Sequence, residues 1–201
     1  MNYVALQVKT SYSLLNSLNS ITKLVDRAKS LGYKSLAITD QNNMFGVPEF
    51  YYECKKNNIK PIIGIELNID EKKILLYAIN NIGYKNLLKL ATIVSEEQIT
   101  LNTLDKYKKN LLLIIPYQYF SQEIYDIYDY KFIGYSNKEE RTKINKPKVL
   151  ITNVSYLNKN DSKYLDYLFM IKEQKNLGEY ELNKKQNQHL LSEEEVLQLS
   201  D

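Results

Sequence analysis

The sequence predicts an α/β fold in which mostly parallel strands are covered by outer helices. The main observation is that short apolar runs with strand periodicity alternate with amphipathic helical segments along most of the chain. The second is length, because 201 residues are enough for one large domain with its own core. Either a doubly wound sheet or a closed barrel fits this alternation, and both place functional residues at the carboxyl ends of strands. We therefore expect sites near Lys9, Asp40, Glu66 and Asn153.

The first half of the chain contains the clearest elements. Residues 3–9 alternate between apolar and more polar side chains, which is the period of a strand. A helix is expected to follow, with Ser20 as its cap and Gly32 as the left-handed residue that ends it. Further strands are expected over 35–39, 61–69 and 73–79, and further helices over 48–57 and 83–97.

The second half continues the alternation with weaker signals. Strands are expected over 111–115, 131–135 and 148–153, and helices over 121–129 and 161–173. Near the end of the chain, Ser192 and Glu195 have the spacing of a capping box, which predicts a short final helix.

Composition excludes several classes of protein. Cys54 is the single cysteine, and no stretch is typical of a signal peptide, so we expect a cytoplasmic protein without disulfides or a cysteine-bound zinc. No apolar run is long enough for a membrane helix. The net charge of +3 is too small to predict nucleic-acid binding by itself. His189 lies in a polar stretch and is expected to be solvated, whereas Cys54 is expected in the core.

Four segments carry a resemblance to a known family. They are VKTSYSLL at 8–15, LAITDQNNMFG at 36–46, KPIIGIE at 60–66 and GYKNLL at 83–88. The first three resemble the motifs of PHP domains, and the fourth resembles a stretch typical of the PHP domains of bacterial DNA polymerase III alpha subunits, closest to the DnaE type. The resemblance is dense over residues 3–90, thin in the middle of the chain, and returns over 148–173.

The resemblance implies a distorted (β/α)7-type barrel over residues 1–180 and the start of a connection toward the polymerase core over 181–201. It implies that the chain is the N-terminal part of a DNA-directed DNA polymerase, a nucleotidyltransferase that as a whole uses Mg²⁺ and binds DNA. The implied partners are the remainder of that subunit, a proofreading exonuclease subunit and other replisome proteins. No cofactor and no membrane contact are expected for the chain itself.

The resemblance also locates the positions at which metal-binding family members hold two or three divalent ions with histidine and acidic side chains. Glu66 alone keeps its family identity, and Asp40 is expected to orient its neighbours rather than to react. Together with Glu66, the ligand-equivalent positions in this chain are Gln7, Lys9, Asn16, Gln41, Lys73, Asn153 and Ser155.

Amide and ammonium groups are poor substitutes for imidazole, so we expect no bound metal and no catalytic residue in this chain. The leading hypothesis is a non-catalytic scaffold domain of a replicative polymerase. The alternatives are an active metal-dependent phosphoesterase or 3′–5′ proofreading exonuclease, and a stand-alone nucleic-acid-binding protein. We also expect the Lys9 ammonium to lie near the Glu66 carboxylate, the alternative being that Lys9 extends to solvent.

Overall fold

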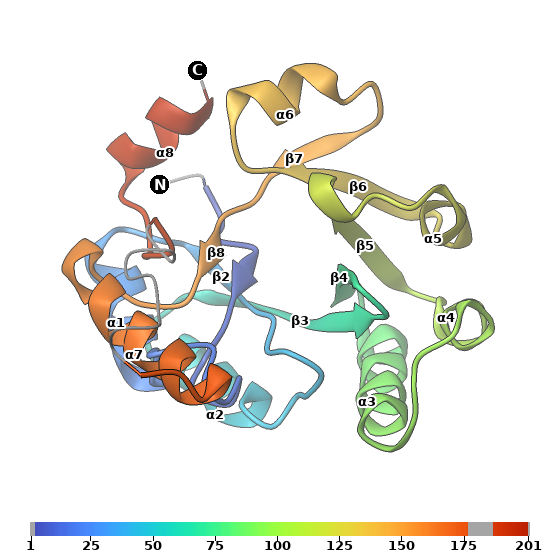
Figure 1. Ribbon diagram of the computed structural model, residues 1–201, viewed down its shortest axis with the longest axis horizontal. Coiled ribbons are helices and arrows are strands. Elements are labelled where there is room, and N and C mark those ends of the chain that lie inside the picture. Colours follow the sequence, from blue (N-terminus) through green and yellow to red (C-terminus); the bar gives the residue numbers. More distant parts are fainter. Residues whose placement is uncertain (1–2, 177–186, 201) are drawn as a thin grey trace. The chain divides into compact units, whose positions relative to one another are not determined.

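The computed structural model describes residues 3–176 and 187–200 (Figure 1). Two compact units are formed, each from separate parts of the chain. Unit 1 comprises Met1–Ile38, Phe45–Pro61 and Thr152–Glu193, and unit 2 comprises Thr39–Met44, Ile62–Ile151 and Glu194–Asp201. Both units contain strands and helices, which confirms the predicted α/β class. The predicted boundary between residues 180 and 181 lies outside the described residues.

Unit 1 contains a short parallel strand pair and three longer helices. In this pair Gln7 lies opposite Asn153 and Val8 lies opposite Val154. The elements of unit 1 are β1 (Gln7–Val8), α1 (Ile21–Ser30), β2 (Ser35–Ile38), α2 (Val47–Lys56), β8 (Asn153–Val154), the 3-10 helix η2 (Lys159–Asp161) and α7 (Ser162–Glu173).

Helix α1 forms where the sequence predicts it, because its apolar side chains recur on one face. Ile21, Leu24, Val25 and Ala28 are all buried on that face. Gly32 has a φ of 80°, a left-handed conformation that suits glycine just after a helix end. Ser20 occupies the N-cap position, but its side chain accepts no capping hydrogen bond, which differs from the prediction.

Unit 2 contains most of a larger sheet together with the remaining helices. Its elements are β3 (Lys60–Ile69, whose first two residues belong to unit 1), β4 (Lys72–Ala78), α3 (Asn81–Glu96), α4 (Leu101–Tyr107), β5 (Leu111–Pro116), the 3-10 helix η1 (Tyr117–Tyr119), α5 (Gln122–Ile127), β6 (Tyr130–Tyr135), α6 (Lys138–Lys143), β7 (Lys148–Leu150) and α8 (Glu193–Ser200, whose first residue belongs to unit 1).

The described sheet of unit 2 is mixed, with strand order β3-β4-β5-β6-β7. Strands β5, β6 and β7 lie side by side and pair in parallel (Figure 1). The pairs β3–β4 and β4–β5 are antiparallel and interrupt the predicted parallel arrangement. The cause of the first interruption is local, because only Asp70 and Glu71 join β3 to β4, and a parallel crossover needs about a dozen residues or more. The seven-stranded barrel stays a prediction.

The beginning of α3 explains one motif of the sequence. The Asn80 side chain caps the helix by accepting from the backbone N–H groups of Ile82 at 3.0 Å and Gly83 at 3.2 Å. A Cβ atom at Gly83 would lie 2.1 Å from the carbonyl oxygen of Asn110. Glycine therefore allows α3 to approach the turn that precedes β5.

The cores of both units consist of aliphatic side chains on the strands and helices. In unit 2, Leu75, Leu87 and Leu113 are completely buried. In unit 1, Phe50 and Cys54 are completely buried on α2, which confirms the core position predicted for the cysteine. Among the described residues, no helix combines the length and apolar character that a membrane crossing requires.

Candidate functional site

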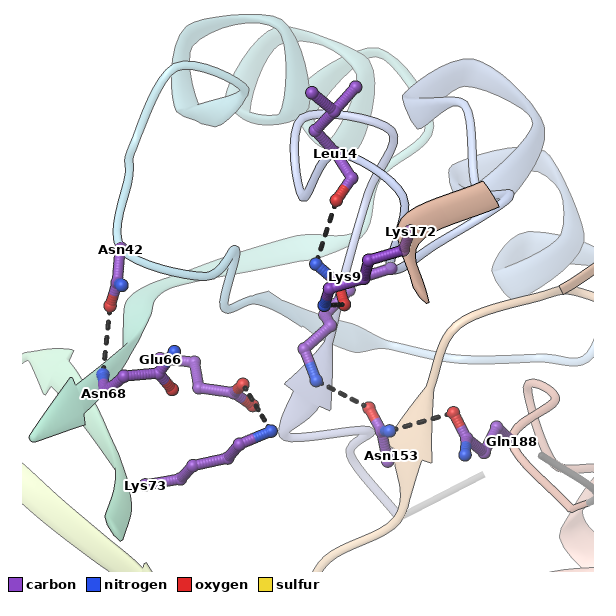
Figure 2. A network of polar contacts seen from close by, with 10 residues as sticks. Lys9, Leu14, Asn42, Glu66, Asn68, Lys73, Asn153, Lys172 and Gln188 are labelled. Atoms are coloured by element: carbon purple, nitrogen blue, oxygen red, sulfur yellow. Dashed lines mark hydrogen bonds and ion pairs between the residues drawn. The ribbon is translucent and has the colours of Figure 1, made fainter. Parts of the chain in front are cut away.

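The first group of ligand-equivalent positions lies where β1 and β8 pair in unit 1. The parallel register places Gln7 beside Asn153, and the Lys9 backbone N–H donates to the Val154 carbonyl at 2.9 Å. The Lys9 ammonium donates to the Asn153 side-chain oxygen at 3.3 Å, and only 5% of Lys9 is exposed (Figure 2). Lys9 is therefore held against a neighbouring ligand-equivalent position rather than extended along the surface.

A residue outside every motif completes this group. The Asn153 side-chain NH₂ donates to the Gln188 side-chain oxygen at 2.9 Å (Figure 2). The backbone N–H of Ser155, another ligand-equivalent position, donates to the Gln188 carbonyl at 2.8 Å. Sequence reasoning missed Gln188, and no local signal pointed to it, because the polar stretch around it has no motif.

Asn16 makes its contacts elsewhere in unit 1. Its side-chain oxygen accepts from the Lys172 ammonium at 2.7 Å, and its side-chain NH₂ donates to the Leu14 carbonyl at 2.9 Å. The first bond joins the loop after β1 to helix α7, and the second lies within that loop. Asn16 thus has a structural role in that loop.

The second group lies around Glu66 in unit 2. The Glu66 backbone N–H donates to the Asp40 carbonyl at 3.1 Å, and the Glu66 backbone carbonyl accepts from the Asn42 backbone N–H at 2.8 Å. Gln41 forms a parallel bridge with Glu66 between these two bonds. The structure therefore brings Asp40 and Gln41 beside Glu66, as the motif positions predict.

Lys73 reaches the same carboxylate from the neighbouring strand. Glu66 lies opposite Leu75 in the antiparallel β3–β4 pair, and Lys73 is two residues from Leu75, so all three share one face of the sheet. The Lys73 ammonium lies 3.8 Å from Glu66 Oε1 (Figure 2). The Glu66 side chain is completely buried, and the Lys73 side chain is 36% exposed. This is an ion pair between a buried carboxylate and a partly solvated ammonium.

The residues at these positions do not fit a divalent metal ion. An ammonium group has three hydrogen-bond donors and no lone pair, so Lys9 and Lys73 cannot be ligands. Each of them places a positive charge beside an oxygen that a metal would need, on Asn153 and on Glu66 respectively. In the described part of the chain, no three or more histidine, cysteine, aspartate and glutamate side chains form a group that could hold a metal ion.

The expected contact between Lys9 and Glu66 joins residues of different units. This contact stays a prediction. The Asp40 side chain is 1% exposed, which is compatible with the orienting role expected for it. Within each unit, an ammonium group already pairs with a polar ligand-equivalent side chain.

The expectation of a solvated His189 is wrong, because the residue is 5% exposed. Its ring stacks on Tyr156, with centroids 6.4 Å apart and an interplanar angle of 20°. A backbone bridge between Tyr156 and His189 brings the two rings together. Burial also raises the pKa of the Tyr156 hydroxyl, which favours its protonated form.

Comparison with known proteins places these observations in a family. The model of the PHP domain family matches residues 5–166. DNA polymerase III subunit alpha from Halalkalibacterium halodurans is 41% identical over 127 residues, which are 58% of this chain and 11% of that protein. The same subunit from Staphylococcus epidermidis is 29% identical over 203 residues, covering 97% of this chain and 19% of that protein.

A solved structure from Bifidobacterium adolescentis, of a protein proposed to be a metal-dependent phosphoesterase, is 10% identical, with a TM-score of 0.45. The alignment covers 98% of this chain and 94% of that chain. The polymerase subunits are much longer than this chain, which spans between 11% and 19% of their length.

Proposed function

The chain belongs to the PHP domain family, and from this premise we propose that it is a metal-free, catalytically inactive PHP domain that serves as a scaffold in a replicative DNA polymerase. The observation that carries the proposal is the ion pair in unit 2. Glu66 is the one ligand-equivalent residue with a carboxylate, and the Lys73 ammonium lies 3.8 Å from it. An internal ammonium thus supplies positive charge at the residue best suited to bind a metal.

Hydrolysis of a phosphoester by a metal site depends on ions that bring the pKa of a bound water close to neutrality. Such ions need neutral imidazole or anionic oxygen ligands, which the ligand-equivalent positions other than Glu66 do not offer. The ammonium groups of Lys9 and Lys73 would also repel a second cation. We therefore derive no hydrolytic step for this chain.

The scaffold part of the proposal rests on the relatives. The proteins matched are DNA polymerase III alpha subunits, and 97% of the chain aligns with one of them at 29% identity. In a longer protein of this kind, the domain would support the polymerase core or the association of a proofreading exonuclease in the cytoplasm. Mg²⁺-dependent nucleotidyl transfer would belong to other domains of that protein.

The proposal is tested by measuring hydrolysis with the purified chain. The substrates are p-nitrophenyl phosphate and an end-labelled single-stranded oligonucleotide, each incubated with Mg²⁺, Mn²⁺ or Zn²⁺. We expect background rates for the parent chain and for the Glu66→Gln variant prepared in parallel. Metal-dependent hydrolysis that survives repurification and is lost in Glu66→Gln would contradict the proposal.

A further inference from the structure

We propose that the paired strands β1 and β8 of unit 1 form a binding site for an extended peptide, and that its resident ligand is the chain's own segment 187–191. This inference goes beyond the scaffold function, because it gives Lys9 and Asn153 a task as peptide-positioning residues. In the sequence, Ser192 alone separates the bound segment from the start of α8.

Backbone hydrogen bonds hold the segment beside Ser155 and Tyr156, which directly follow β8, in the manner of an added strand. The N–H groups of Ser155 and Tyr156 donate to the Gln188 carbonyl at 2.8 Å and 3.2 Å. In return, the Leu190 N–H donates to the Tyr156 carbonyl at 3.2 Å. The Tyr156–His189 bridge between these bonds is parallel. Contacts of this kind bind an extended backbone without selecting its sequence.

The Lys9 ammonium supplies selectivity through the side chain of Asn153. Because an ammonium only donates, it binds the oxygen of the Asn153 amide, at 3.3 Å. The NH₂ of that amide is thereby turned toward Gln188, whose side-chain oxygen accepts from it at 2.9 Å. The site therefore requires an acceptor at position 188, such as a carboxamide or carboxylate oxygen.

Aromatic and apolar contacts hold the rest of the segment. The Gln188 N–H donates to the Tyr156 hydroxyl at 3.0 Å, and His189 stacks on the same ring. Leu190 and Leu191 are 1% and 5% exposed, and the Tyr33 hydroxyl donates to the Leu191 carbonyl at 2.9 Å. The ligand is therefore an extended peptide with an acceptor side chain followed by a flat ring and two leucines.

The test is hydrogen exchange of the full 201-residue chain, followed in peptides that cover residues 187–191. Gln188→Leu removes the acceptor, and Lys9→Met removes the group that orients Asn153. Each should raise exchange of the segment about tenfold, which corresponds to the loss of a hydrogen bond worth about 1.4 kcal/mol. Gln188→Glu keeps an acceptor oxygen and should exchange like the parent.

Lys172→Met is the matched control, because it removes another ammonium-to-asparagine hydrogen bond of unit 1, the one to Asn16 at 2.7 Å. It should leave exchange of the segment unchanged. The double variant Lys9→Met, Gln188→Leu should exchange about as fast as either single variant. Both substitutions interrupt the same chain of side-chain hydrogen bonds, from Lys9 through Asn153 to Gln188. The inference is overturned if Lys9→Met matches the control, if all peptides exchange faster to the same extent, or if the double variant shows additive effects.

Exchange is measured without added metal and reports no hydrolysis. Failure of this inference would therefore leave the proposal of an inactive domain untouched. Conversely, metal-dependent hydrolysis in the earlier assay would contradict that proposal without changing the exchange of the segment.

Discussion

Replacing Lys73 with methionine tests whether an ammonium stabilises the buried Glu66 carboxylate. Methionine keeps an unbranched stem of similar length and removes only the charge. Two unit charges 3.8 Å apart attract by about 4 kcal/mol at an effective dielectric constant of 20. The Lys73 side chain is 36% exposed, so solvent screening reduces this figure. Breaking a fully buried pair costs about 3–5 kcal/mol, and we expect about 2 kcal/mol here.

Urea and thermal unfolding at pH 7 measure this loss. For a chain of this size, about 2 kcal/mol corresponds to a Tm lower by roughly 4–8 °C.

Lys108→Met is the control, because Lys108 lies 2.8 Å from Asp105 but both side chains are at least 43% exposed. Solvent screens an exposed pair even at this shorter distance, so we expect Lys108→Met to lose much less stability than Lys73→Met. The reasoning is refuted if Lys73→Met is no less stable than Lys108→Met at pH 7.

Three further predictions concern buried groups. Burial, with a smaller contribution from Glu53, raises the pKa of the Cys54 thiol to about 12, so the unfolded chain loses this proton first as the pH rises. Stability of the parent should therefore fall between about pH 8.5 and pH 12, and Cys54→Ala should lessen this fall in urea titrations at successive pH values. Gly83→Ala should cost about 1–3 kcal/mol by the same method, because its Cβ would lie 2.1 Å from the Asn110 carbonyl oxygen, and an unchanged midpoint would contradict this. The buried Tyr128 hydroxyl has no hydrogen-bond partner among the described residues, so Tyr128→Phe should raise the thermal midpoint or leave it unchanged, and a marked loss would disprove the assignment.

The helices predicted from sequence are those with a buried apolar face. Helix α1 illustrates this, whereas the short α8, observed over Glu193–Ser200, was expected from the capping-box spacing of Ser192 and Glu195. Helices α4 and α6 were missed because Leu104 is the one buried side chain of α4 and α6 buries none. Their caps were available signals, since the Thr100 and Asn137 side chains accept from backbone N–H groups of the first turn.

The candidate site was predictable to the extent that motifs mark it. Asp40, Gln41 and Glu66 come together because their segments pair directly. The Lys73–Glu66 contact depends on the register of the β3–β4 pair. The short turn between the strands fixes this register, but the sequence motifs contain no information about it. The places of Gln188 and His189 follow from backbone pairing with residues 155–156, more than thirty positions earlier, and no local periodicity reveals such pairing.

The central claim is that the ligand-equivalent positions hold no metal, and metal stoichiometry tests it most directly. The purified chain is incubated with Zn²⁺, Mn²⁺ or Fe²⁺, desalted and analysed by inductively coupled plasma mass spectrometry, with Glu66→Gln treated in the same way. We predict far less than one ion per chain for each metal, with no difference between parent and variant. One or more ions retained per parent chain and lost in Glu66→Gln would contradict the account.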